Sequence, residues 1–481
     1  IRLFSLLALA ALSAGAAYTW TDPDIVRAAA EGDLAGVKKL VAEGADVNAT
    51  GAYQRTPLHK AARNGNREVV AFLIENGADL NAGQKHRFGR KRTPLHLAAQ
   101  FGHPAVVTLL IEHGADVNSK ATYNVTPLHL AASFGHRVVA ELLVGGGGDV
   151  NAGDGDRMTP LHRAVEEGHG EIATLLLENG ADGNVMNRTG TPLHLAAAGG
   201  WDKIAELLLT EGTDVAAHGP HSNGTAIDKA AAAGHANVVQ LLLAHGADAN
   251  SLVYGSGRTP LHHAAVNGHA SVATVLLRNN ADIEAKTGRR LRRRTPLHSA
   301  AKAGHLGVCQ VLLANGADIQ VRDADDYTAL HYAAENGYVS IAELLTETGA
   351  VVNARNSNGQ TPLHGAVTGG HPQVVELLIT AGADIDSKDT NGMTALHLTA
   401  RHNRHQIAKL LLARNATVNA VTENGWTPLH IAAHHLNGTL IDVLLRNGAD
   451  PTVKTQNQST AQALARTEIQ GRDAVTGKTV L

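Results

Sequence analysis

The chain has 481 residues, a net charge of −3 at pH 7 and a hydrophobic fraction of 44%. A nearly neutral charge argues against the uniformly basic proteins that bind nucleic acid over their whole surface. The single cysteine, Cys309, excludes a disulfide within the chain. Aromatic residues make up only 3% of the chain, which is thin for one large core and favours many thin layers packed from Ala, Leu and Val.

The first residues differ in kind from the rest of the chain. Arg2 is followed by an apolar run over residues 3–12 and then by small residues that include Ala14 and Ala16. These are the parts of a secretory signal peptide, and the run is shorter than the roughly 20 apolar residues of a membrane span. We therefore predict a signal peptide over residues 1–16 and an exported protein, periplasmic or secreted. The alternative is a cytoplasmic protein that retains this segment as an ordinary helix.

A tetrapeptide, Thr-Pro-Leu-His, first appears at Thr56 and returns about every 33 residues, a period that indicates stacked supersecondary units. Thr is a good helix N-cap, and Pro suits the first helical position because its missing N–H is not needed there. The later copies, including the variants with Ala in place of Pro and two degenerate ones, begin at Thr93, Thr126, Thr159, Thr191, Thr225, Thr259, Thr295, Thr328, Thr361, Thr394, Thr427 and Thr460.

The rest of each unit follows the same plan. An Ala-Ala pair continues the first helix, and a Gly such as Gly65 ends most copies of it. A second apolar helix comes next, as in residues 69–74, and Asn-Gly-Ala-Asp at residues 76–79 leads into an extended loop. Each unit therefore predicts helix, turn, helix and loop, and we call the loop before each tetrapeptide a finger.

With this period and these residues, the chain resembles the ankyrin-repeat proteins, whose signature begins Thr-Pro-Leu-His-x-Ala. The resemblance implies an all-α ankyrin-repeat solenoid, a curved superhelical stack of about fourteen repeats. Residues 22–54 would form an N-terminal capping repeat, residues 55–457 twelve full repeats, and residues 458–481 a C-terminal cap and tail. It also implies that the tetrapeptide histidines tie each loop to its neighbour. Cys309 aligns with Val70 in the second helix, so we expect a buried structural thiol.

Motifs for catalysis or metal binding are weak. His402, His405, His434 and His435 lie in adjacent repeats, but no acidic or cysteine partner completes a zinc or copper site. No nucleophile, base and orienting acid share a recognisable spacing. The sequence predicts a protein that is not an enzyme, with no catalytic residues, no metal and no cofactor.

Two fingers are lengthened, and both insertions are basic. The first carries Lys85, Arg87, Phe88, Arg90, Lys91 and Arg92. The second carries Arg289, Arg290, Arg292, Arg293 and Arg294. Asp323, Asp325 and Asp326 lie one repeat after the second finger, so its arginines could simply pair with them, whereas the first finger has no acidic finger beside it. Arginine beside an aromatic residue is typical of binding hot spots, although a solvated loop is the alternative.

The concave surface is the other predicted contact region. Residues directly after the tetrapeptide, such as Lys60, Leu97 and Leu130, vary between repeats and are expected to face it. The aromatic residues of the chain are densest in the same repeats, and we predict the main partner site over residues 53–167, with contacts from Tyr53, Phe101, Tyr123 and Phe134.

The prediction is therefore a monomeric, non-catalytic scaffold that binds a protein partner of unknown identity through its fingers and concave groove. The alternative is an electrostatic adaptor that docks on nucleic acid or anionic lipid through the two basic fingers, which strong salt dependence would support. In a eukaryotic cytosol, the resemblance would make Asn48, Asn118, Asn151 or Asn353 sites of hydroxylation.

Replacing Arg87, Phe88 and Arg90 by Ala should weaken partner binding and leave the melting temperature nearly unchanged, because these residues lie in an insertion. Circular dichroism would measure the melting temperature beside the binding assay. A large loss of stability would show that the first basic finger is structural.

Overall fold

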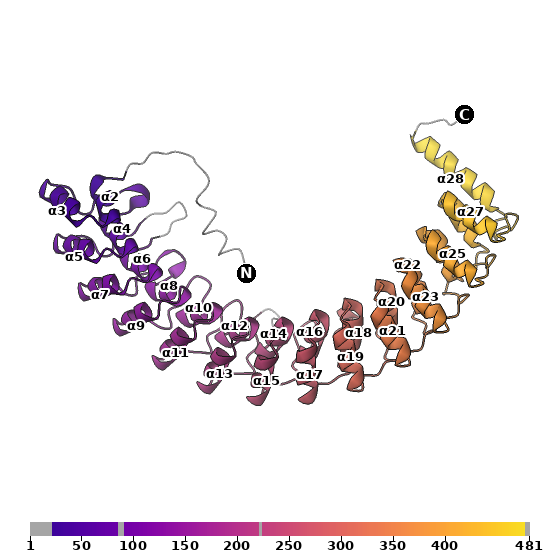
Figure 1. Ribbon diagram of the computed structural model, residues 1–481, viewed down its shortest axis with the longest axis horizontal. Coiled ribbons are helices and arrows are strands. Elements are labelled where there is room, and N and C mark those ends of the chain that lie inside the picture. Colours follow the sequence, from indigo (N-terminus) through magenta and orange to yellow (C-terminus); the bar gives the residue numbers. More distant parts are fainter. Residues whose placement is uncertain (1–21, 85–90, 221–223, 477–481) are drawn as a thin grey trace. The chain divides into compact units, whose positions relative to one another are not determined.

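The computed structural model describes residues 22–84, 91–220 and 224–476, and side chains through residue 469. The predicted signal peptide and residues 85–90 of the first basic finger lie outside the described residues. Within the described ranges the chain consists of α-helices, short 3-10 helices and two isolated β-bridges, as an ankyrin-repeat solenoid requires. Figure 1 shows these helices following one another in pairs.

Except in the leading repeat, which lacks the tetrapeptide, the first helix of each pair begins at the second residue of its tetrapeptide. The first helices are α2 (Asp24–Glu31), α4 (Pro57–Asn64), α6 (Pro94–Phe101), α8 (Pro127–Ser133), α10 (Pro160–Glu166), α12 (Pro192–Gly199), α14 (Ala226–Ala233), α16 (Pro260–Asn267), α18 (Pro296–Ala303), α20 (Ala329–Asn336), α22 (Pro362–Gly369), α24 (Ala395–His402) and α26 (Pro428–His434). A last helix, α28 (Ala461–Thr476), follows the final finger.

The second helices return along the first. They are α3 (Leu34–Ala42), α5 (Arg67–Glu75), α7 (Pro104–Glu112), α9 (Arg137–Gly145), α11 (Gly170–Glu178), α13 (Asp202–Thr210), α15 (Ala236–Ala244), α17 (Ala270–Arg278), α19 (Leu306–Ala314), α21 (Val339–Glu347), α23 (Pro372–Thr380), α25 (His405–Ala413) and α27 (Gly438–Arg446). Among the described residues, three fingers contain a 3-10 turn, η2 (Ala52–Gln54), η3 (Thr122–Asn124) and η4 (Arg289–Leu291).

In most repeats the tetrapeptide histidine joins its repeat to the next finger, as predicted. The backbone N–H of Thr56 donates to His59 Nδ1 at 3.2 Å, so the ring proton lies on Nε2, which donates to the carbonyl of Arg92 at 3.0 Å. His96 reaches Val125 and His129 reaches Met158 in the same way, each at 2.9 Å. A buried neutral imidazole therefore fixes both a helix start and the finger of the following repeat.

A second histidine set holds the turn between paired helices. His103 Nε2 donates to the carbonyl of Arg63 at 2.8 Å, across from the glycine that ends α4. That glycine, Gly65, has φ of 77°, and a Cβ there would lie 2.6 Å from His103 Nδ1. Both the backbone conformation and the space therefore require glycine at this turn.

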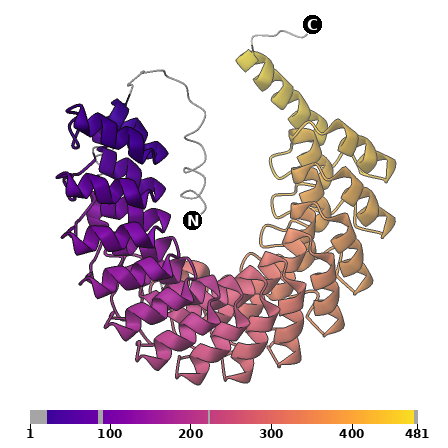
Figure 2. The ribbon, with the colours of Figure 1, turned by 60° about the vertical axis from the view of Figure 1, so that its left-hand side comes forward.

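Contacts divide the chain into two compact units. Unit 1 comprises Ile1–Ala196 with Lys203–Asp214, and unit 2 comprises Ala197–Asp202 with Val215–Leu481. Inside each unit, first helices pack against first helices and second helices against second helices, which makes two layers (Figures 1 and 2). No described helix is long and apolar enough to cross a membrane.

The core lies between the two layers of helices. In the first full repeat it holds Leu58, Ala61 and Ala62 of α4 and Val70 and Leu73 of α5, all fully buried. The short Ala side chains let neighbouring first helices approach closely. Cys309 on α19 is fully buried as well, as predicted, and burial raises the pKa of its thiol to about 12. It therefore acts as a small apolar core residue at neutral pH.

Because of the buried histidines, we expect acid to destabilise the protein at pH values well above the pKa range of ordinary carboxylates. Burial lowers the pKa of several tetrapeptide histidines to about 4, including His59, His96 and His162, whereas an unfolded histidine has a pKa near 6.5. Between about pH 6.5 and pH 4 the unfolded chain binds protons that the folded chain excludes, so stability falls as the pH decreases through this window. Urea unfolding at pH 7.5, 6.5 and 5.5 would measure this loss.

His96→Gln should reduce the pH dependence of that unfolding, because it removes one group whose pKa changes on folding. His113→Gln, at an exposed histidine of unit 1, is the matched control and should leave the slope as it is. Equal stability at pH 7.5 and 5.5 would contradict the prediction.

Candidate partner-binding surface

The root of the first basic finger closes on itself through an isolated bridge. The backbone N–H of Gln84 donates to the carbonyl of Arg92 at 3.0 Å. Of the predicted contacts in this finger, Lys91 is exposed and Arg92 is half-buried. Lys85, Arg87, Phe88 and Arg90 lie outside the described residues, so their part in the predicted site stays a prediction.

Two fingers of unit 1 present tyrosine side chains from strained turns. Tyr53 and Gln54 have φ of 59° and 53°, and Tyr123 and Asn124 have φ of 60° and 57°. A left-handed conformation is unfavourable for a bulky residue and costs on the order of 1–3 kcal/mol. The rings recover little of this by burial, because 54% of Tyr53 and 77% of Tyr123 is exposed. Strain at exposed aromatic residues favours a role in binding.

The predicted helix aromatics lie on the first helices of neighbouring repeats. Phe101 ends α6 and is 41% exposed, and Phe134 caps α8 and is 51% exposed. The Arg63 guanidinium lies over the Phe101 ring, 5.0 Å from its centroid, and Phe134 stacks on His136. With the tyrosines, they make an exposed surface over α4, α6, α8 and their fingers, which we call the first-helix face of unit 1.

A small cavity of about 200 Å³ opens between α4, α6 and the fingers before them. Two of its arginines donate to glutamine side chains: Arg55 Nε donates to Gln84 Oε1 at 2.9 Å and Arg92 Nη1 donates to Gln100 Oε1 at 2.5 Å. Burial, followed by the charge of Arg63, lowers the pKa of Arg55. We call this cavity the arginine pocket, and it is lined by Arg55, Arg63, Gln84, Arg92, Leu97, Gln100 and Phe101.

The second basic finger, in unit 2, is largely engaged with its acidic neighbour. Arg292 Nε lies 3.0 Å from Asp325 Oδ2, and Arg294 Nε lies 3.9 Å from Asp323 Oδ2. The pairing that the sequence left open is therefore confirmed for these two arginines. Arg289, Arg290 and Arg293 are exposed and form no ion pair with other described residues.

The prediction that residues after the tetrapeptide line the concave surface was wrong for Leu97 and Leu130. Leu97 is 4% exposed and Leu130 is 7% exposed, because this position lies where adjacent first helices pack. Arg163 and Tyr332, at the same position, turn towards their own finger instead. Arg163 contacts Asp154 at 2.6 Å and the Tyr332 hydroxyl donates to Asp323 at 2.5 Å. An aspartate nine residues before a polar residue signals this pairing in the sequence.

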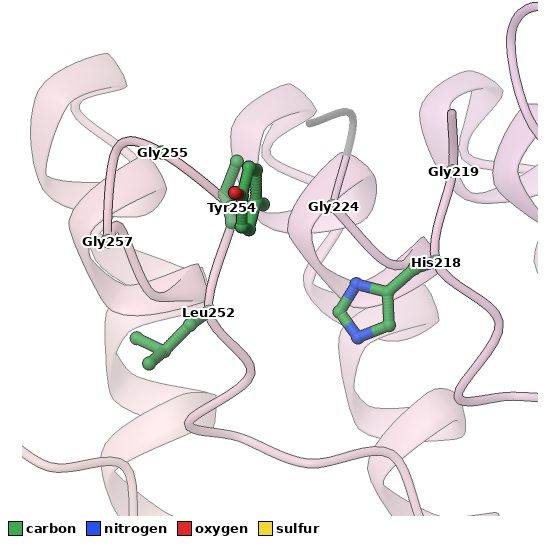
Figure 3. A pocket seen from close by; sticks show the side chains of 8 residues that line it. His218, Gly219, Gly224, Leu252, Tyr254, Gly255 and Gly257 are labelled. Atoms are coloured by element: carbon green, nitrogen blue, oxygen red, sulfur yellow. The ribbon is translucent and has the colours of Figure 1, made fainter. Parts of the chain in front are cut away.

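Sequence reasoning missed a larger cavity in unit 2. It has a volume of about 720 Å³ and lies between two fingers that contribute His218, Leu252 and Tyr254 (Figure 3). Tyr254 is 84% exposed. Glycines at 219, 224, 255 and 257 line the cavity, and they have no side chains to fill it. The signal was the unusual glycine content of these fingers, beside an aromatic residue that the sequence analysis did not place in the site. Within the described ranges, no group of His, Cys, Asp or Glu is arranged to hold a metal ion.

Phe101→Ala should change the free energy of unfolding by about 0.5 kcal/mol or less, as for most exposed positions. Leu97→Ala, four residues earlier on α6, should lower it by about 2–5 kcal/mol because it leaves a cavity in the core. Urea unfolding of both variants would measure the difference. A loss from Phe101→Ala as large as that from Leu97→Ala would show that the aromatic residue builds the scaffold.

Comparison with known proteins agrees with this architecture. The family model described as "Ankyrin repeats (3 copies)" matches residues 25–121, 121–187, 183–253, 252–323, 297–389 and 363–455. Myotrophin of Xenopus tropicalis is 45% identical over 58 residues, which are 12% of this chain and 49% of myotrophin. Alpha-latrocrustotoxin-Lt1a of Latrodectus tredecimguttatus is 47% identical over 62 residues, 13% of this chain and 4% of the toxin.

The 2-5A-dependent ribonuclease of Mus musculus is 35% identical over 77 residues, 15% of this chain and 10% of the ribonuclease. The chain thus covers less than half of each of these relatives, and the likeness is confined to short runs of repeats. The family model, in contrast, follows the repeats from residue 25 to residue 455. This chain belongs to the ankyrin-repeat family.

Proposed function

We propose that this protein is a non-catalytic scaffold that binds a partner protein across the first-helix face of unit 1. The observation that carries the proposal is the run of exposed aromatic side chains on neighbouring repeats, Tyr53, Phe101, Tyr123 and Phe134. In a chain with 3% aromatic residues, such a concentration has no explanation in core packing. Ankyrin repeats generally serve as protein-interaction modules, which agrees with this assignment.

The scaffold suits binding because the contact residues are held in place before the partner arrives. Phe101 and Phe134 stand on helices whose starts are fixed by the buried histidines His96 and His129. Aromatic side chains bury much area at a low cost in side-chain entropy, which is why they dominate binding hot spots. A partner would therefore meet a rigid row of anchors.

Enzymatic names among the relatives do not transfer to this chain. The palmitoyltransferase Hip14 of Drosophila melanogaster is matched over 9% of its length and the ribonuclease over 10% of its length. Those short matches fall within repeats of this chain and support only a shared repeat scaffold.

The electrostatic adaptor is the second candidate, and exposed Arg289, Arg290 and Arg293 favour it. It has less support than the scaffold, because Arg292 and Arg294 of the same finger already contact aspartates. Binding that releases many counterions falls steeply with salt, so a steep salt dependence would favour the adaptor.

Selection from a random peptide display library on the immobilised full chain would test the scaffold. We expect an enriched peptide family whose affinity falls at least about tenfold in the double variant Phe101→Ala, Phe134→Ala, the usual effect of removing hot-spot aromatics. Fluorescence anisotropy with the synthetic peptide would measure the affinity.

Val138→Ala is the matched control, since Val138 is 55% exposed in the same unit but stands on the second helix α9. It should bind as the wild type does. Failure to enrich any peptide, or equal affinity in the double variant, would contradict the proposal.

A further inference from the structure

We propose that the arginine pocket binds one anionic side chain of the partner, a carboxylate or a phosphorylated hydroxyl, and this inference rests on the proposed scaffold function. The occupant would be an acidic residue within an extended segment that lies on the first-helix face of unit 1. Its neighbours in that segment would contact Phe101.

Two arginines of the pocket, Arg55 and Arg63, bring positive charge that no described carboxylate pairs with. No carboxylate is among its lining residues, and Arg55 and Arg63 form no ion pair with any described residue. Arg55 is instead supported by the amide oxygen of Gln84, which is 4% exposed, and Arg63 by the face of Phe101. A guanidinium has five N–H donors, and these supports orient Arg55 and Arg63 while leaving donors for a ligand.

The carboxylate that acts on Arg55 is already engaged. Asp22 accepts from Lys60 Nζ at 2.9 Å and from the backbone N–H of Ala52 at 2.7 Å. It therefore pairs with Lys60 and caps the finger, and it neutralises little of the positive charge in the pocket. The excess positive charge is a property of this site and not of the whole chain, whose net charge is −3.

An arginine at the same repeat position shows what a purely structural arrangement looks like. Arg55 and Arg294 each directly precede the tetrapeptide threonine of their repeat. Arg294 lies 3.9 Å from Asp323 and donates to the Tyr332 hydroxyl at 2.8 Å, so its charge is satisfied within the fold. At Arg55 the fold supplies a glutamine in place of the acid, and a ligand is left to supply the anion.

The size of the pocket decides between a side chain and a free small molecule. At about 200 Å³ it is smaller than the roughly 300–1,000 Å³ of small-molecule sites. Leu97 and Phe101 provide an apolar wall beside the arginines, which suits the methylene stem of a side chain that ends in anionic oxygens. Paired guanidinium donors match carboxylate and phosphate geometry equally well, so the geometry names their shared chemistry.

Three sets of arrayed peptides would separate the two sources. The sets share random flanking residues that include an aromatic one, and differ only in a central glutamate, phosphoserine or glutamine. Probed with the full chain, the glutamate set or the phosphoserine set should bind at least about tenfold more tightly than the glutamine set, as expected for hydrogen bonds to a charged group. The better of the two identifies the anion as carboxylate or phosphate.

Arg63→Gln should abolish this preference for the anionic sets. Arg446→Gln removes the same charge from an exposed arginine of unit 2, at the end of α27, and should keep it. Melting temperatures of both variants would be measured, and Arg63 is exposed at the end of α4, so neither change should unfold the protein.

Each other outcome overturns the inference in a distinguishable way. Equal binding of the glutamate, phosphoserine and glutamine sets, with dependence on Phe101, would leave the scaffold and remove the anion site. An equal loss in Arg63→Gln and Arg446→Gln would show diffuse electrostatic attraction. No binding by any set would contradict the scaffold and the pocket together.

Discussion

The hydrogen bond from a buried neutral histidine to the finger of the next repeat is the interaction on which the structure depends. In His129 the Nδ1 atom accepts from the Thr126 N–H, and Nε2 donates to Met158. One imidazole thus fixes a helix start and the neighbouring loop together. Charging the ring would turn the Nδ1 acceptor into a donor and break the first contact. The buried tetrapeptide histidines therefore position the fingers and the side chains that the fingers carry.

The repeated residues build the scaffold. The chemistry of the surface is therefore determined by the positions that vary between repeats. The residue before the tetrapeptide shows this well. It is arginine in Arg55 and Arg294, yet one is held by a glutamine and the other by an aspartate and a tyrosine. The same backbone therefore carries either an internal ion pair or unneutralised charge, depending on whether the residue 29 positions after the arginine is Asp323 or Gln84.

Much of the fold could be predicted from the sequence because the residues of each repeat determine where its own helices begin and end. The threonine caps, the glycine turns and the burial of Cys309 all follow from residues within one repeat. The burial of Leu97 could not be predicted, since it depends on how closely two first helices approach. The arginine pocket also escaped prediction, because Gln84 and Arg55 meet only through the stacking of separate repeats.

Between the two terminal units, one repeat departs from the histidine rule, and the departure shows what the rule does. Asp228 replaces the histidine on α14, and its carboxylate can accept from Thr225 and Ser251 but cannot donate to the next finger. Its Oδ1 atom is buried without a partner among the described residues, and burial raises the pKa of the group. The finger that follows is closed by its own bridge between Val253 and Arg258. That finger carries Tyr254, which is 84% exposed, and forms one wall of the cavity in unit 2. In this repeat the bond that a histidine would donate to the next finger is replaced by one that the Asp228 carboxylate accepts from Ser251 of that finger, and the finger keeps a closing bridge like that of the first basic finger.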